Sequence, residues 1–221
     1  IIMHKSVQNL INIEDQIKSN LNGLSITELP KIIAVSKTFK IENILPLIDH
    51  GHTSFGENKV QEAIDKWSEI KQKKPNIDLH MIGRLQTNKV KFAVKLFDFI
   101  HSVDSEKLAT KISEEQSKIQ KNVKIFIQVN IGNENQKSGI DSDQTSSLVS
   151  YCKKLNLNVV GLMCIPPFNK DPVIFFKEIS KMNKIHKFKE LSMGMSSDYL
   201  EAAKYNATYL RIGSAIFGQR D

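Results

Sequence analysis

The chain has few cysteines and no long hydrophobic run, and both absences limit what it can be. Its 221 residues include two cysteines, Cys152 and Cys164, which form no disulfide framework and match no metal-ligand spacing. This cysteine usage is typical of a reducing cytoplasm, and we expect Cys164 to be packed at the end of an apolar strand. No segment has the roughly 18 apolar residues that a membrane span requires, and no signal peptide is recognisable. We therefore expect a cytoplasmic protein without a membrane partner.

Glycine-rich phosphate loops are also lacking. No dinucleotide-binding fingerprint follows the first predicted strand, no P-loop motif occurs, and no internal repeat or low-complexity tract is present. The apolar fraction of 40% and the charged fraction of 25% are those of an ordinary globular protein, and 221 residues fit one domain. We expect a single domain over residues 1–221, in which Ile1 and Ile2 ahead of Met3 fit residues left over from cloning.

The formal net charge of +7 raises the question of nucleic-acid binding. The basic residues do not form one stripe, and their densest cluster, Lys71 with Lys73 and Lys74, ends a predicted helix just before Pro75. Cations are favoured there because the helix dipole is negative at its C-terminus. We interpret the cluster as a solvated helix end and expect no nucleic-acid partner.

What the sequence does contain is a regular alternation of short apolar runs and helical patterns. A first amphipathic helix carries Val7, Leu10, Ile11, Ile17 and Leu21 on one stripe. Eight strands are then predicted at residues 32–35, 53–55, 79–82, 97–103, 123–131, 159–164, 190–193 and 208–212. Helices are predicted between them around residues 41–50, 58–73, 87–95, 105–120, 142–155, 172–187 and 197–205. The pattern predicts the α/β fold class, as a single-domain (β/α)8 TIM-like barrel preceded by an N-terminal helix, with an open doubly wound sheet as the alternative.

Lys37 follows the first predicted strand, where a parallel barrel places its chemistry. A lysine amine in apolar surroundings at that position loses part of the stabilisation of its charge and can form Schiff bases. With 28 lysines in the chain, an ordinary surface role is the alternative. Polar or glycine-bearing segments also end the second to fifth strands, at residues 55–58, 80–84, 101–104 and 130–139.

The ends of the seventh and eighth predicted strands indicate an anion site. Ser196, Ser197 and Asp198 open a helix, Arg211 lies at the end of the last predicted strand, and Gly213 follows it directly. The alternative is that the first three merely cap the helix. Arg211 favours the anion site, because only three arginines occur in this lysine-rich chain and the guanidinium is the more rigid cation. A Schiff-base lysine together with an anion site points to a phosphorylated aldehyde, of which pyridoxal 5′-phosphate (PLP) is the obvious one.

Seven motifs, in order, resemble the pyridoxal phosphate homeostasis proteins, a family similar in fold to the barrel domain of alanine racemase. They lie at residues 34–38, 55–58, 80–89, 101–105, 161–163, 191–196 and 210–213. The resemblance implies that Lys37 carries PLP as an internal aldimine and that Asn58 lies beside it. It also implies that Ser196 and the backbone at Gly213 hold the phosphate. Arg211 would face the pyridine nitrogen, and a fixed cation there keeps that nitrogen unprotonated and weakens the ring as an electron sink.

The resemblance implies a PLP-binding protein that carries or buffers PLP in intracellular cofactor homeostasis without substantial turnover. We expect a monomer that transiently contacts PLP-dependent apoenzymes and has no catalytic residue and no metal. The alternative is a racemase-like PLP enzyme acting on amino acids. Alanine racemase takes a second base, a tyrosine, from a separate β-domain, which we expect to be absent here; none of Tyr151, Tyr199, Tyr205 and Tyr209 is an evident substitute. The segment 166–189 looks short for the family, but it contains no predicted site residue.

Overall fold

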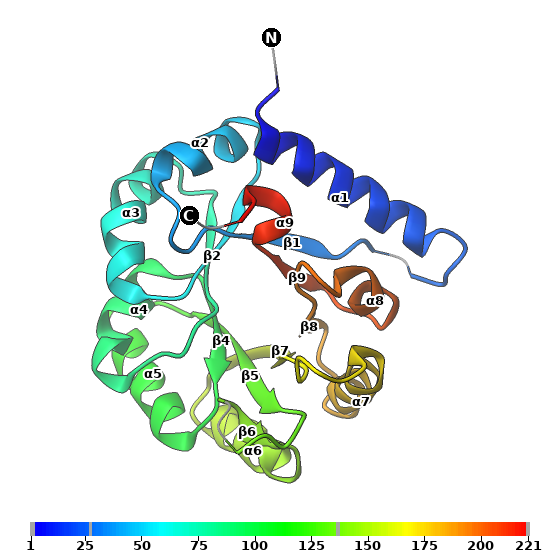
Figure 1. Cartoon of the computed structure of the whole chain (residues 1–221). Helices are drawn as coiled ribbons and strands as arrows, with labels where there is room; N and C mark the ends of the chain where they lie inside the picture. Colours follow the sequence, from blue (N-terminus) through cyan, green and yellow to red (C-terminus); the bar gives the residue numbers. More distant parts are fainter. Residues whose placement is uncertain (1–2, 27, 136–137, 220–221) are drawn as a thin grey trace.

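The computed structural model describes residues 3–26, 28–135 and 138–219, and in these ranges eight parallel strands close into a barrel (Figure 1). Around the barrel the strand order is β1, β2, β3, β4, β5, β7, β8 and β9, and β9 pairs with β1. The strands are β1 (Lys31–Val35), β2 (Ser54–Glu57), β3 (Asp78–Met81), β4 (Phe99–Val103), β5 (Lys124–Asn130), β7 (Asn158–Cys164), β8 (Glu190–Ser192) and β9 (Tyr209–Ile212). The predicted barrel is thus confirmed, and because pairings β4–β5 and β1–β9 leave no open edge, the open sheet is wrong.

Helices follow the strands and cover the outside of the barrel (Figure 1). They are α2 (Ile41–Asp49), α3 (Val60–Lys73), α4 (Val90–Leu96), α5 (Glu106–Lys118), α6 (Thr145–Lys154), α7 (Pro172–Ile185), α8 (Tyr199–Lys204) and α9 (Ser214–Phe217). The predicted N-terminal helix is α1 (Lys5–Leu21), which packs against α2, α8 and α9. The short α9 and the two-residue strand β6 (Ile140–Asp141), which pairs with β5, were not predicted, because so few residues show no periodicity.

Most differences from the predicted elements lie at their ends. The fourth strand begins at Phe99 rather than at residue 97, because Phe97 still donates its amide to Ala93 and ends α4. On α1, Ile13 is buried in place of Ile11, which is half-exposed. Expectations for Ile1 and Ile2 concern residues outside the described ranges.

Two layers of apolar side chains form the core. Ile32 and Ala34 of β1 face the helices and belong to the large outer cluster, whereas Ile33 faces the barrel interior. This alternation follows from the two-residue period of a strand. The interior cluster also contains Phe99, Phe126, Met163 and Tyr209. On β1, every second residue counted from Ile33 therefore points into the barrel interior.

The basic cluster at the end of α3 is only partly a solvated helix end. Lys73 and Lys74 are exposed, but Nζ of Lys71 lies 2.5 Å from Oδ2 of Asp98 and also donates to the carbonyl of Ile77. Lys71 therefore ties α3 to the start of the next strands. None of the helices in the described ranges is long and apolar enough to cross a membrane.

Candidate functional site

A cavity of about 800 Å³ lies at the carboxyl ends of the strands, and all five predicted site residues line it. These are Lys37, Asn58, Ser196, Arg211 and Gly213. Its volume is that of an ordinary small-molecule site. The cavity is also lined by Val35, Ile82, Gly83, Arg84, Gln128, Val129, Asn130, Ser138, Ile165, Met195, Ser197, Ser214 and Gln219.

The strand period explains why these side chains meet. Lys37 lies two residues after Val35 and four after Ile33, so its side chain is expected on the same, inward-facing side as theirs, just beyond the end of β1. Arg211 has the parity of Tyr209, whose ring lies in the interior cluster. Since parallel strands end at the same edge, the inward rows of β1 and β9 converge on one cavity.

The backbone at Lys37 forms a tight turn. The amide of Phe39 donates to the carbonyl of Ser36 over 3.2 Å, and Thr38 has a φ of 68°. A positive φ at the third position of such a turn is usually taken by glycine, and a β-branched residue there is strained. Lys37 thus sits at the second position of a turn that must be held by its surroundings.

Asn58 is placed by a close backbone approach. A Cβ atom on Gly83 would lie 2.5 Å from the carbonyl oxygen of Asn58, so only glycine fits there. The two residues lie in the loops after β3 and β2, which the contact holds side by side. The sequence signal for this contact is the glycine two residues after the end of β3.

Ser196 does not cap the helix that follows it. Its Oγ accepts the amide of Ala215 over 3.2 Å, which links the loop after β8 to the first turn of α9. Asp198 accepts the amide of Met195 over 2.7 Å but makes no side-chain cap to α8. The capping alternative is therefore wrong for Ser196, whose hydroxyl lies beside the segment that begins at Gly213.

Arg211 is buried and fixed by two hydrogen bonds. Its Nη1 donates to Oγ of Ser192 over 2.6 Å and its Nη2 to the carbonyl of Cys164 over 2.9 Å. Burial lowers the pKa of Arg211, while Cys164 and Asp198 raise it. A guanidinium nevertheless stays charged at ordinary pH, so a fixed cation borders the cavity. Cys164 is buried as expected, and burial raises the pKa of its thiol to about 12.

The electrostatic character of the cavity is one-sided. Lys37, Arg84 and Arg211 line it, and its lining residues in the described ranges include no carboxylate. Such a site favours an anion. The amine of Lys37, the fixed guanidinium of Arg211 and several hydroxyl and amide donors fit the aldehyde and the phosphate of PLP, so the residues present are suited to that group.

Several lining residues were not among the predicted site residues, and the most informative is Arg84, which was expected only as part of the strand-end segment 80–84. It follows β3 and borders the cavity from the side opposite β8 and β9 in the barrel order. The rarity of arginine in this chain, which favoured Arg211 as a site residue, could also have identified Arg84. Gln128 was missed because it lies inside the apolar run of β5, where only the inward parity distinguishes it.

Four side chains inside the barrel, Ser54, His80, His101 and Ser192, form a row linked by hydrogen bonds. Ser54 Oγ lies 2.9 Å from Nε2 of His80, whose Nδ1 lies 2.9 Å from Nε2 of His101. Nδ1 of His101 lies 2.9 Å from the Ser192 hydroxyl that accepts from Arg211. Both rings are fully buried, and burial lowers their pKa values well below 6.5, so they are neutral. The two histidines were expected among the polar strand-end residues but lie within their strands.

None of the four tyrosines lines the cavity. The hydroxyl of Tyr151 lies 2.8 Å from Oγ1 of Thr110 and that of Tyr199 donates to Gln16, both on the outer helices. Tyr209 lies in the interior cluster, and Tyr205 ends α8. Among the described lining residues there is also no histidine, cysteine, aspartate or glutamate. Lys37 is therefore the titratable group in these ranges that could move protons within the cavity.

Comparison with known proteins gives a consistent result. Residues 13–221 match the family model for the N-terminal domain of alanine racemase. The pyridoxal phosphate homeostasis protein of Vibrio cholerae is 36% identical over 99% of this chain and 98% of its own. The solved structure of PipY from Synechococcus elongatus with PLP bound is 30% identical, with a TM-score of 0.83 over 96% of this chain and 100% of that one. A protein of Bifidobacterium adolescentis described as unknown is 27% identical, with a TM-score of 0.89 over 96% and 94%. The chain therefore belongs to the pyridoxal phosphate homeostasis proteins, within the wider family that shares the N-terminal domain of alanine racemase.

Proposed function

We propose that this protein binds PLP in the cavity at the carboxyl ends of its strands and carries or buffers it in cytoplasmic cofactor homeostasis. The observation that carries the proposal is the placement of Lys37 beside Arg211 and Ser196 in one cationic cavity. Family membership supports it, as does PLP bound to the related PipY. PLP supplies an aldehyde that condenses with a lysine amine, and Lys37 is the lysine that lines the cavity.

Each predicted residue then has a binding role. Ser196 and the backbone at Gly213 and Ser214 hold the phosphate, because hydroxyl and amide donors form charge-assisted hydrogen bonds with an anion. Arg211 faces the pyridine nitrogen, and Asn58 lies beside the ring. These assignments rest on the geometry of the cavity and on the resemblance of the motifs.

The carrier function is favoured over racemisation because the described lining residues offer no second acid or base. Two-base racemisation needs a proton donor and acceptor on opposite faces of the cofactor. Lys37 could serve one face, and the tyrosines lie elsewhere. We propose that the protein binds and releases PLP without substantial turnover, acts as a monomer and contacts apoenzymes transiently.

Reduction of the PLP-loaded protein with borohydride, followed by peptide mapping, tests the proposal. We expect a pyridoxyl group on Lys37 and its loss in Lys37→Ala, with the fold retained because the side chain lies in a cavity rather than in the core. Lys59→Ala is the control, since Lys59 is exposed and follows Asn58 directly. A wild-type protein labelled mainly at another lysine would overturn the assignment.

Delivery is tested separately. The loaded protein is mixed with an apoenzyme that needs PLP, and the recovery of activity is compared with the rate at which free PLP leaves the protein. Recovery faster than spontaneous release supports direct contact. Recovery limited by release restricts the function to buffering.

A further inference from the structure

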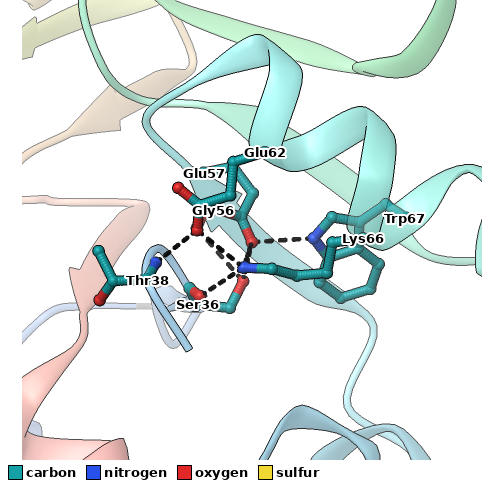
Figure 2. A network of polar contacts seen from close by, with 7 residues as sticks. All are labelled: Ser36, Thr38, Gly56, Glu57, Glu62, Lys66 and Trp67. Atoms are coloured by element: carbon teal, nitrogen blue, oxygen red, sulfur yellow. Dashed lines mark hydrogen bonds and ion pairs between the residues drawn. The ribbon is translucent and has the colours of Figure 1, made fainter. Parts of the chain in front are cut away.

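Ser36 and Thr38, the residues on either side of Lys37, are hydrogen-bonded to residues of β2 and α3 (Figure 2). We propose that Glu57, Glu62 and Lys66 are positioning residues that anchor the turn at Lys37 and so direct the Lys37 amine into the cavity. The inference rests on the proposed function, because it concerns the lysine to which PLP is expected to attach. None of the three residues lines the cavity.

The centre of the anchor is a buried ion pair. Nζ of Lys66 lies 2.9 Å from Oε1 of Glu57, and the side chains are 8% and 0% exposed. The same carboxylate oxygen accepts from Nε1 of Trp67 over 2.9 Å. All these contacts are made to Oε1, since the buried Oε2 of Glu57 has no hydrogen-bond partner in the described ranges. Breaking the ion pair would leave a buried charge uncompensated, which holds Oε1 and the ammonium in one geometry. The pair is therefore a rigid point of attachment between β2 and α3.

Glu57 and Lys66 hold the turn on the N-terminal side of Lys37, through contacts with Ser36. The hydroxyl of Ser36 donates to Oε1 of Glu57 over 2.7 Å, and Nζ of Lys66 donates to the carbonyl of Ser36 over 2.9 Å. Ser36 is thus held at both its side chain and its backbone. Its carbonyl also accepts the amide of Phe39 that closes the turn. The ammonium of Lys66 therefore binds the same oxygen that defines the turn.

Glu62 holds the turn on the C-terminal side of Lys37, through a contact with Thr38. The backbone amide of Thr38 donates to Oε1 of Glu62 over 2.5 Å, and that oxygen lies 3.1 Å from Nζ of Lys66. The three protons of the Lys66 ammonium thus have three acceptors, on Ser36, Glu57 and Glu62. Thr38 has the strained positive φ, and strained backbone persists where the surroundings over-determine it. Figure 2 shows how Ser36 and Thr38, the neighbours of Lys37 in the chain, are held from one side.

A second lysine on the same helix provides a matched control. Lys71 also pairs with a partly buried carboxylate, Asp98, but this contact lies at the start of the strands rather than at the cavity. Lys66→Met removes an ammonium from α3 together with its ion pairs to Glu57 and Glu62, and Lys71→Met removes one together with its ion pair to Asp98. A merely structural role predicts that neither variant alters the amides of Thr38 and Phe39 selectively. A positioning role predicts that only Lys66→Met alters the turn.

The experiment has two readouts, and the first does not need PLP. Amide hydrogen exchange at Thr38 and Phe39 is measured by NMR in the cofactor-free protein. We expect Lys66→Met and the milder Glu62→Ala to lose protection at these two amides, with Lys71→Met unchanged there. Glu62→Gln retains an oxygen that accepts from Thr38, so it should restore most of the protection. Because Glu62 is 28% exposed, its variants keep the test available if Lys66→Met fails to fold.

The second readout is the rate at which PLP attaches to Lys37, followed by visible absorption and borohydride trapping. We expect Glu62→Ala and Lys66→Met to slow it by about ten- to a hundredfold, because small misplacements of a reacting group have effects of that order. Unchanged amide protection and unchanged rates in folded Glu62→Ala would overturn the inference. Failure of the wild-type protein to label at Lys37 would instead overturn the proposed function, whatever the amides show.

Discussion

Arg211 donates a hydrogen bond from Nη1 to the Ser192 hydroxyl over 2.6 Å, and this contact sets the direction of the hydrogen bonds below the cavity. A guanidinium only donates, and in the described ranges Nδ1 of His101 is the acceptor available to the Ser192 proton. His101 then carries its own proton on Nε2 and donates to Nδ1 of His80. His80 in turn donates from Nε2 to Ser54. The charge of Arg211 thus fixes the donor and the acceptor in each hydrogen bond of the row Ser192, His101, His80 and Ser54 inside the barrel.

The first prediction concerns the tautomers of these two rings. We expect nitrogen NMR of the imidazoles to show both His80 and His101 in the neutral form with the proton on Nε2. In Ser192→Ala, His101 loses the donor to its Nδ1, and leaving a buried acceptor unpaired costs about 1–3 kcal/mol of unfolding free energy. A proton found on Nδ1 of His101 in the wild type would contradict the direction derived from Arg211.

The second prediction concerns acid stability. The folded protein keeps the pKa values of both histidines below 6.5, so the unfolded chain binds protons that the folded one does not as the pH falls through that value. The free energy of unfolding should therefore fall below pH 6.5, by up to about 1.4 kcal/mol per pH unit for each ring, and level off above it. Urea unfolding between pH 5 and 7, compared with His101→Gln, measures the slope. If the unfolding free energy of His101→Gln falls with pH as steeply as that of the wild type, His101 does not contribute to the pH dependence.

The third prediction concerns the phosphate. Pyridoxal without phosphate should bind much more weakly than PLP, because it lacks the anion that the cavity favours. Ser196→Ala should lose about 1 kcal/mol of PLP binding, since backbone donors remain. Ser117→Ala on α5 is the control. Equal affinities of the wild-type protein for pyridoxal and PLP would place the anion site elsewhere.

The fourth prediction concerns Arg211 and separates a carrier from an enzyme. Arg211→Glu replaces a cation by an anion beside the ring nitrogen, so we expect a shifted absorption spectrum and weaker retention of PLP. Arg211→Lys keeps the charge and should change the spectrum less. Neither variant should gain racemisation, because the described lining residues still offer no second base.

Deuterium exchange at the α-carbon of several amino acids is the decisive measurement for that distinction. We expect no exchange at enzyme-like rates by the wild-type protein or by the variants of Arg211. Rapid exchange by the wild type would favour the racemase-like function and would require a second base beyond the described lining residues.

The sequence alone determined the alternation of strands and helices that favours a barrel, and it placed Lys37 just after the first strand. The apolar run before Ser36 is followed by a lysine of inward parity, and both facts depend only on neighbouring residues. The same reasoning placed Arg211 at the end of the last strand. Such local patterns are reliable because hydrophobic periodicity is imposed by the elements themselves.

Only the tertiary structure decided the contacts between distant segments. His80 pairs in register with Gly56, one residue before the last paired residue of β2, so it lies inside the barrel rather than at its mouth. Ser196 meets Ala215, and Lys66 meets Ser36, because register and helix packing bring these elements together. No local pattern fixes the register between separate strands or the face that one helix turns towards another loop, which is why the anchor of the Lys37 turn is visible only in the folded chain.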